Sequence, residues 1–253
     1  MNVFVTGASS GIGAALARHY AARGDNVGLF ARRQGELDAL VDEFPAGHAA
    51  AWTGDVRDAA ALARAAADFI ARFGPPDVVI ANAGVSRGTL TEQAGDAVAF
   101  REVMDINVLG MVHTFAPFIA SMRSARRGAL AGIASVAGFR GLPGAGAYSA
   151  SKAAAIAYLE SLRLELTGSG VAVVTICPGY IATSMTAGNP YPMPFIISPE
   201  RAARLIAGAI ARRRRFYVLP WPMAIVGWVL RILPRPLYDL AFAHAPRKPR
   251  RPG

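Results

Sequence analysis

The chain has 253 residues, 53% hydrophobic and 17% charged, which excludes a disordered protein and suffices for one α/β domain with a substantial core. One cysteine, Cys177, excludes an intramolecular disulfide and a cysteine-based metal cluster, and four scattered histidines predict no metal site. Residues 201–253 hold twelve basic side chains and one acidic, so the net charge of +10 belongs to this part of the chain.

A glycine-rich turn follows the first apolar run. Residues 2–6 are apolar and residues 14–23 are amphipathic, so the order is strand, turn, helix. Such a turn lets backbone amides approach a phosphate, and the helix N-terminus offsets its charge. A dinucleotide site is predicted at Gly7, Ser9, Ser10, Gly11, Ile12 and Gly13. Because no basic leader precedes the first strand, we expect no signal peptide and a cytoplasmic protein.

Two arginines follow the second predicted strand, residues 26–31. NAD enzymes usually place an acidic side chain there for the ribose 2′-hydroxyl. Arg32 and Arg33 instead suit a 2′-phosphate, because guanidiniums form forked, charge-assisted hydrogen bonds. The alternative is a solvated helix start in which Glu36 and Asp38 pair with the arginines. We expect NADP(H) rather than NAD(H).

Strand and helix signals continue to alternate. Strands are predicted at 49–53 and 77–81, with a helix at 59–73 between them. Asp55 has two open roles, acceptor for the adenine amino group or cap of the next helix. The second of these strands ends in Asn82-Ala83-Gly84. A helix at 96–124 contains Asn107, whose amide favours a local bend or a held water, and Pro117, which is predicted to interrupt it.

A proton-delivery site is predicted where the fifth strand, residues 129–134, is followed by a helix at 148–166. Tyr148 and Lys152 stand four residues apart, so they share a helix face. A nearby ammonium lowers the pKa of a phenol from its usual value near 10, toward the range useful for acid catalysis. Ser135 follows the strand and is placed to hold a carbonyl oxygen. Only two lysines occur against 25 arginines, and Lys152 is one of them.

Chemistry-bearing residues stand at the ends of successive predicted strands, the sixth of which spans 171–176. In parallel sheets ligands bind outside the carboxyl ends of the strands. Such ends hold Gly7, Arg32, Asp55, Asn82, Ser135 and Pro178. The predicted fold is therefore α/β, a Rossmann-like doubly wound parallel sheet of about seven strands with helices on both faces.

At residues 2–220 the chain resembles a short-chain dehydrogenase/reductase. The matching motifs are T-G-A-S-S-G-I-G at 6–13, N-A-G at 82–84, N-V at 107–108, Ser135, Y-S-A-S-K at 148–152 and P-G at 178–179. Ala81 departs from the second Asn common before N-A-G. The resemblance implies a catalytic tetrad of Asn107, Ser135, Tyr148 and Lys152, and homodimers or homotetramers formed through the helices at 96–124 and 148–166.

The resemblance also implies a role for each group. Tyr148 would be the acid or base and Ser135 would orient the carbonyl. Lys152 would lower the phenol pKa and hold the nicotinamide ribose, and Asn107 would support a water in a proton relay. Thr183 would contact the carboxamide. Beyond the glycine turn and the two arginines, the cofactor-binding set is Asp55, Val56, Asn82, Ala83, Gly84, Tyr148, Lys152, Pro178, Gly179, Ile181 and Thr183.

The segment 184–200 would be a mobile lid. Its Met185, Met193 and Phe195 favour a hydrophobic ketone; alternatively they cover the core when the lid is closed. We expect the protein to be an NADP(H)-dependent oxidoreductase that acts on a hydrophobic ketone or alcohol. The alternatives are a steroid- or lipid-type alcohol dehydrogenase working oxidatively, and a non-catalytic, membrane-associated dinucleotide-binding scaffold.

Residues 221–253 are predicted to extend a 1–220 domain. The apolar run between Pro222 and Pro234 is too short to span a bilayer. Two tryptophans and flanking arginines suit an interfacial helix, so 212–253 is a candidate for membrane-surface contact. A helix packed over the substrate cleft, or a subunit contact, is equally consistent. We expect residues 246–253 to be disordered and no nucleic acid to bind.

Overall fold

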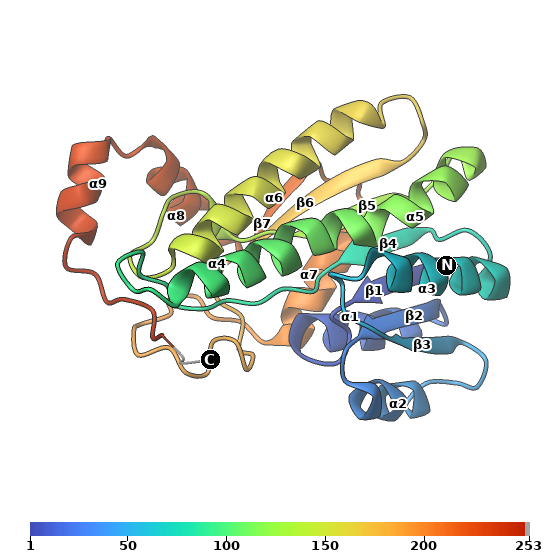
Figure 1. Ribbon diagram of the computed structural model, residues 1–253. Helices are drawn as coiled ribbons and strands as arrows, with labels where there is room; N and C mark the ends of the chain where they lie inside the picture. The colour runs from blue at the N-terminus through green and yellow to red at the C-terminus, as the bar shows by residue number, and fades with distance from the viewer. Residues whose placement is uncertain (251–253) are drawn as a thin grey trace.

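The computed structural model describes residues 1–250 and contains one seven-stranded sheet (Figure 1). All the strand pairs are parallel and the order is β3-β2-β1-β4-β5-β6-β7, which confirms the predicted fold class. The strands are β1 Asn2–Thr6, β2 Asn26–Ala31, β3 Ala49–Thr53, β4 Val78–Ala81, β5 Ala129–Ile133, β6 Ala172–Pro178 and β7 Phe216–Leu219.

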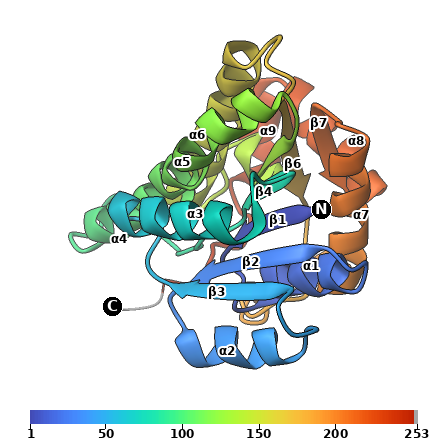
Figure 2. The same cartoon turned by 90° about the vertical axis from the view of Figure 1, so that its right-hand side faces the viewer.

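Helices cover both faces of the sheet (Figure 2). One face carries α1 Gly11–Ala21, α2 Gln34–Asp42 and α7 Pro199–Ala211, and the other carries α3 Ala59–Phe73, α5 Gly110–Ala125 and α6 Gly146–Glu165. Aromatic rings dominate the second face, where Phe4 of β1 packs on Phe69 and Phe118. All three are fully buried, and burying each such side chain contributes roughly 1.5–3 kcal/mol. These two cores hold the strand ends in fixed positions.

A π-helical turn, Asp105–Leu109, joins α4, Asp96–Met104, to α5. Asn107 lies in it, so the helix changes its hydrogen-bond pattern at the position where a bend or a held water was predicted. Pro117 does not interrupt the helix, because α5 continues to Ala125 and the fully buried Phe115 and Phe118 hold it on the sheet. The stretch 96–125 is the one helix among the described residues with the length and apolar composition to cross a membrane. It packs against α3 and α6 as a core helix does.

Two further helices follow β7, α8 Trp221–Ile232 and α9 Arg235–Phe242. The inner face of α8 is packed, since Met223 lies over Gly179 and Gly227 lies against the Phe139 ring. No residue of α9 is buried. The prediction that residues 246–250 are disordered is wrong. Their backbone packs closely against Gly88 and Gly144, so they lie against the domain. Residues 251–253, included in the same prediction, lie outside the described part.

Candidate active site

The sheet order reverses between β1 and β4, whose neighbours lead in opposite directions along the chain. At such a point the loops leaving the two strands diverge and open a crevice outside the carboxyl ends. The predicted site residues follow β1, β2, β3, β4, β5 and β6 in turn. The parallel register therefore places them along one edge of the sheet.

The glycine turn between β1 and α1 has the geometry of a phosphate cradle. Gly7 and Gly11 have φ of +67° and +55°, values that side chains other than glycine rarely adopt. A Cβ on Gly13 would lie 2.2 Å from the Gly7 carbonyl oxygen. These glycines leave the backbone amides and the α1 N-terminus open to an anionic group. The turn thus fits a dinucleotide.

Asn82, directly after β4, braces this turn. Its side-chain amide donates to the Thr6 carbonyl at 3.0 Å and to the Gly7 carbonyl at 3.3 Å. A Cβ on Gly7 would lie 2.8 Å from the Ala83 Cα, so only glycine allows this approach. Asn82 and Ala83 therefore shape the turn from the side opposite α1.

Arg32 and Arg33 lie beside the glycine turn, with side chains more than half exposed. The Arg33 guanidinium donates to the Ser9 hydroxyl at 3.0 Å and lies 3.8 Å from Glu36. Arg32 lies 3.8 Å from Asp55. Of the predicted pairs with Glu36 and Asp38, only Arg33 with Glu36 forms among the described residues, whereas Arg32 pairs with Asp55. Both guanidiniums remain accessible to a bound anion.

Asp55 does not cap α3, which corrects one of its two predicted roles. The cap is Asp58, which accepts from the Ala61 amide at 3.0 Å. Asp55 instead accepts from Arg57, with its Oδ2 2.7 Å from the guanidinium, and this hydrogen bond lowers the pKa of Asp55. The next residue, Val56, is buried, and its carbonyl lies 3.0 Å from His113 Nδ1.

Tyr148 and Ser135 meet at the centre of the site. Ser135 is buried directly after β5, and its Oγ lies 3.4 Å from the Pro178 carbonyl. Desolvation raises the pKa of Tyr148, and a hydrogen bond with Ser135 offsets part of the rise. The sequence-based expectation of a lowered phenol pKa is therefore wrong for this structure. At neutral pH the phenol holds its proton.

Lys152 lies one helical turn beyond Tyr148 and is 4% exposed. Its Nζ donates to the Ile133 carbonyl at 2.7 Å and lies 5.8 Å from the centroid of the Tyr148 ring. Burial lowers the pKa of Lys152 to about 8. The ammonium donates to a β5 carbonyl and not to the phenol oxygen. It therefore does not counter the rise in the pKa of Tyr148 that desolvation causes.

Asn107 holds the loop that follows β4. Its Oδ1 accepts from the Val85 amide at 2.8 Å, and its Nδ2 donates to the Val85 carbonyl and the Ser151 hydroxyl, both at 2.9 Å. A Cβ on Gly84 would lie 3.2 Å from Asn107 Oδ1 and 3.5 Å from Lys152 Nζ. Asn107, Gly84 and Lys152 therefore form one packed layer below the crevice.

The end of β6 completes the crevice. Gly179 follows Pro178 and contacts Met223. Ile181 is buried and forms a β-bridge with Ile197. A Cβ on Gly11 would lie 3.1 Å from the Thr183 methyl, so Thr183 stands directly over the glycine turn. Burial raises the pKa of Cys177 to about 12, which leaves a protonated, packed thiol.

Comparison with known proteins places this site in a family. The family model described as short chain dehydrogenase matches residues 1–191. The chain belongs to the short-chain dehydrogenases. An oxidoreductase of Myxococcus xanthus without an assigned substrate is 40% identical over 239 residues, covering 94% of each chain.

Two other similar proteins carry different nicotinamide cofactors in their names. A 2-dehydro-3-deoxy-L-rhamnonate dehydrogenase (NAD(+)) of a Sphingomonas species is 37% identical over 69% of each chain. A variant of actinorhodin polyketide ketoreductase with NADPH superposes with a TM-score of 0.76 at 28% identity, covering 86% of this chain and 94% of that one. The family therefore predicts a nicotinamide dinucleotide and leaves its phosphorylation state to this chain's own residues.

Sequence reasoning missed two residues near the site of this short-chain dehydrogenase. Lys248 lies beside Tyr148, with its Nζ 5.7 Å from the ring centroid, and it donates to the Ser86 Oγ at 2.6 Å. No local motif marks either residue, and they stand 162 positions apart. One feature of the sequence could have pointed to Lys248. The chain has only two lysines, and the scarcity that drew attention to Lys152 applies equally to Lys248.

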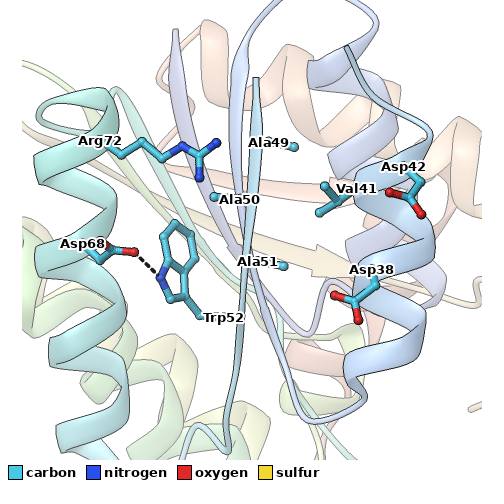
Figure 3. Close-up of a pocket in the computed structure, with 9 residues that line it drawn as sticks. All are labelled: Asp38, Val41, Asp42, Ala49, Ala50, Ala51, Trp52, Asp68 and Arg72. Carbon is cyan, nitrogen blue, oxygen red and sulfur yellow. Dashed lines mark hydrogen bonds between the residues drawn. The ribbon is translucent and has the colours of Figure 1, made fainter. Parts of the chain in front are cut away.

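A hollow of about 460 Å³ beside the edge strand β3 is a different feature (Figure 3). The Trp52 indole points into it and donates to Asp68 at 2.7 Å. None of its nine lining residues is a predicted site residue. The crevice at the carboxyl edge, not this hollow, is therefore the candidate active site of the dehydrogenase.

Proposed function

We propose that the protein is an NADP(H)-dependent carbonyl reductase that transfers a hydride to a hydrophobic ketone and protonates the resulting alkoxide from Tyr148. The proposal rests on the position of the Tyr148 phenol, which is hydrogen-bonded to Ser135, at the strand edge that also holds the glycine cradle. Reduction needs the phenol as an acid, and oxidation needs the phenolate as a base. The same Tyr148 would therefore serve as the acid in reduction and as the base in the reverse reaction.

Each remaining group has a proposed task. Ser135 orients the substrate carbonyl, Lys152 holds the nicotinamide ribose, Thr183 meets the carboxamide, and Asn107 supports a proton relay. When bound, the nicotinamide supplies the hydride. The dinucleotide would lie against Gly7, Ser9, Ser10, Gly11, Ile12, Gly13, Asp55, Val56, Asn82, Ala83, Gly84, Pro178, Gly179 and Ile181.

A 2′-phosphate is the proposed ligand of Arg32 and Arg33. No acidic residue directly follows β2, and two half-exposed guanidiniums stand there. A hydrogen bond to a charged group contributes roughly 1.5–3 kcal/mol. We therefore expect kcat/KM to favour NADPH over NADH, and the double change Arg32→Ala/Arg33→Ala to reduce that preference by about 10–100-fold.

The matched control is Arg123→Ala. Arg123 lies in the last turn of α5, before β5 begins, and hence at the opposite edge of the sheet. It should leave the NADPH-to-NADH ratio unchanged. An unaltered ratio in the double variant, with both cofactors still used, would remove the proposed 2′-phosphate site.

Apolar lid residues support a hydrophobic substrate. Met185 and Phe195 are 42% and 51% exposed, so neither covers the core. They lie in the segment that follows Thr183, above the crevice. We infer that they contact the apolar part of a ketone when the segment closes.

The surface of α8 and α9 supports contact with an anionic membrane. Trp221, Trp228 and Leu240 are 73%, 61% and 78% exposed, and residues 212–215 are all arginine. Aromatic side chains at the headgroup level and nearby cations are typical of interfacial binding. We expect the full chain to co-sediment with vesicles containing phosphatidylserine, and Trp228→Glu to weaken this. Equal sedimentation with and without vesicles would exclude the contact.

Homo-oligomers through α4–α5 and α6 are a further inference from the family. Val98, Leu109 and Leu164 are exposed apolar residues on these helices. Burying them in a subunit contact would remove this surface from water.

A further inference from the structure

The last described residues return from α9 to the mouth of the crevice. Figure 1 shows this segment leaving α9 and running back beneath the ends of α4 and α6 toward the label C. We name residues 246–250 the terminal strap. Nothing in the proposed reaction above uses it.

The strap is seated on two glycines. A Cβ on Gly88 would lie 2.5 Å from the Pro249 carbonyl oxygen and 2.6 Å from that of Lys248. A Cβ on Gly144 would lie 2.9 Å from the Lys248 amide nitrogen and 2.9 Å from the Arg247 Cβ. Contacts this close with backbone atoms are possible only where the side chain is absent, so the strap backbone fits both loops.

Side chains tie the strap to the loop after β4. Arg250 forms an ion pair with Asp96, with a nitrogen–oxygen distance of 2.9 Å, and this pair lowers the pKa of Asp96. Asp96 also accepts from the Leu90 amide at 2.6 Å, which fixes the carboxylate. Lys248 donates to Ser86 at 2.6 Å. The strap therefore has one polar contact within the glycine contact, at Lys248, and one just beyond it, at Arg250.

These two loops border Tyr148. Thr89 bridges to Ala145, and its hydroxyl accepts from the Ala147 amide at 3.2 Å, so the loops meet beside the phenol. The strap crosses them there, and its Lys248 Nζ lies 5.7 Å from the Tyr148 ring centroid. The strap therefore lies within reach of the substituents of a ketone whose oxygen meets Tyr148 and Ser135.

We propose that the terminal strap is the outer wall of the substrate site and limits the size of the ketone that reaches Tyr148. This inference rests on the proposed reductase function and adds the substrate class, a compact carbonyl compound. A bulky ketone needs the space that residues 247–249 occupy. Displacing the strap should therefore raise kcat/KM for bulky ketones and leave compact ones nearly unchanged.

Gly88→Ala is the variant that displaces the strap in the full chain. Gly88 has an ordinary φ, so its substitution strains no turn, and the added methyl meets only strap backbone at short range. Gly95→Ala is the matched control, because a Cβ there meets nothing within 4 Å. Both glycines lie in the same loop region between β4 and the body of α4, and neither is assigned to catalysis or cofactor binding.

The experiment compares wild type, Gly88→Ala and Gly95→Ala with cyclohexanone and benzophenone under saturating NADPH. Strap position is followed independently by trypsin, as loss of the residues after Arg247 from the intact mass. Gly88→Ala should release these residues faster and raise the benzophenone-to-cyclohexanone ratio of kcat/KM by about tenfold, an effect typical of pocket contacts. Gly95→Ala should match wild type in both measurements.

Two results would contradict the proposal that the terminal strap is the outer wall of the substrate site. One is faster release of the strap by Gly88→Ala with an unchanged substrate ratio. The other is an equal rise in kcat/KM for both ketones, which would mean that the strap hinders every substrate regardless of size. Should no protein reduce any carbonyl, the proposed function fails separately, and calorimetric binding of benzophenone then decides: tighter binding by Gly88→Ala supports the wall, and equal binding contradicts it.

Discussion

Tyr148→Phe is expected to lower kcat/KM for ketone reduction by about 10²–10⁴-fold, the usual contribution of a positioned proton donor. The variant removes one hydroxyl and keeps the ring that packs between two ammonium groups. NADPH affinity should fall far less than the rate, because the variant removes one predicted cofactor contact and leaves the glycine cradle and the arginines untouched. The measurement is the initial rate of NADPH oxidation, with NADPH binding followed by fluorescence.

Ser169→Ala is the control for this variant, since it removes a hydroxyl at the turn after α6, far along the chain from the crevice. The pH profile provides a second readout. Because the pKa of Tyr148 is raised, reduction should stay level through neutral pH and fall only in alkaline solution. Equal rates for wild type and Tyr148→Phe would exclude the proposed proton donor.

Lys152→Met is expected to abolish most activity and yet to stabilise the protein without ligand. The ammonium is buried, and its pKa of about 8 in the fold compares with 10.5 for the free side chain. By linkage, this difference in pKa corresponds to roughly 3 kcal/mol of destabilisation by the charged side chain at neutral pH. Methionine fills a similar volume without the cost of burying a charge.

The pH dependence of stability follows from proton binding by Lys152. Between pH 8 and 10.5 the unfolded chain holds the Lys152 proton and the folded chain releases it, so this group makes stability rise with pH. The free energy of unfolding, measured by urea denaturation, should therefore differ most between variant and wild type below pH 8 and converge as pH rises through this window. A variant less stable than wild type at pH 7 would contradict this account of Lys152.

Local patterns were sufficient to predict the sheet and the strand that each candidate residue follows. Alternating apolar runs and glycine turns fix which strand each residue follows, and parallel pairing then brings the strand ends to one edge. This is why Gly13, Ser135 and Lys152 were placed from the sequence. Their positions depend on neighbours within a few residues and on a topology with few alternatives.

The remaining features depend on tertiary contacts. In the sequence Asp55 is a candidate cap of the next helix, whereas the extended backbone at residue 58 makes Asp58 the cap. The pKa direction of Tyr148 follows from burial and from Lys152 bonding a strand carbonyl, which spacing does not show. The terminal strap rests on glycines more than a hundred residues away, so its composition alone predicted disorder.

Transfer of deuterium from NADPH to the product tests directly whether this protein catalyses hydride transfer. NADPH carrying deuterium at the reactive ring carbon is incubated with cyclohexanone and the full-length protein, and the alcohol is analysed by mass spectrometry. The account predicts that the alcohol formed by wild type carries the deuterium at its carbinol carbon and that Tyr148→Phe forms almost none. Tight binding of NADPH by a correctly folded protein, with no deuterated alcohol from any ketone, would contradict it.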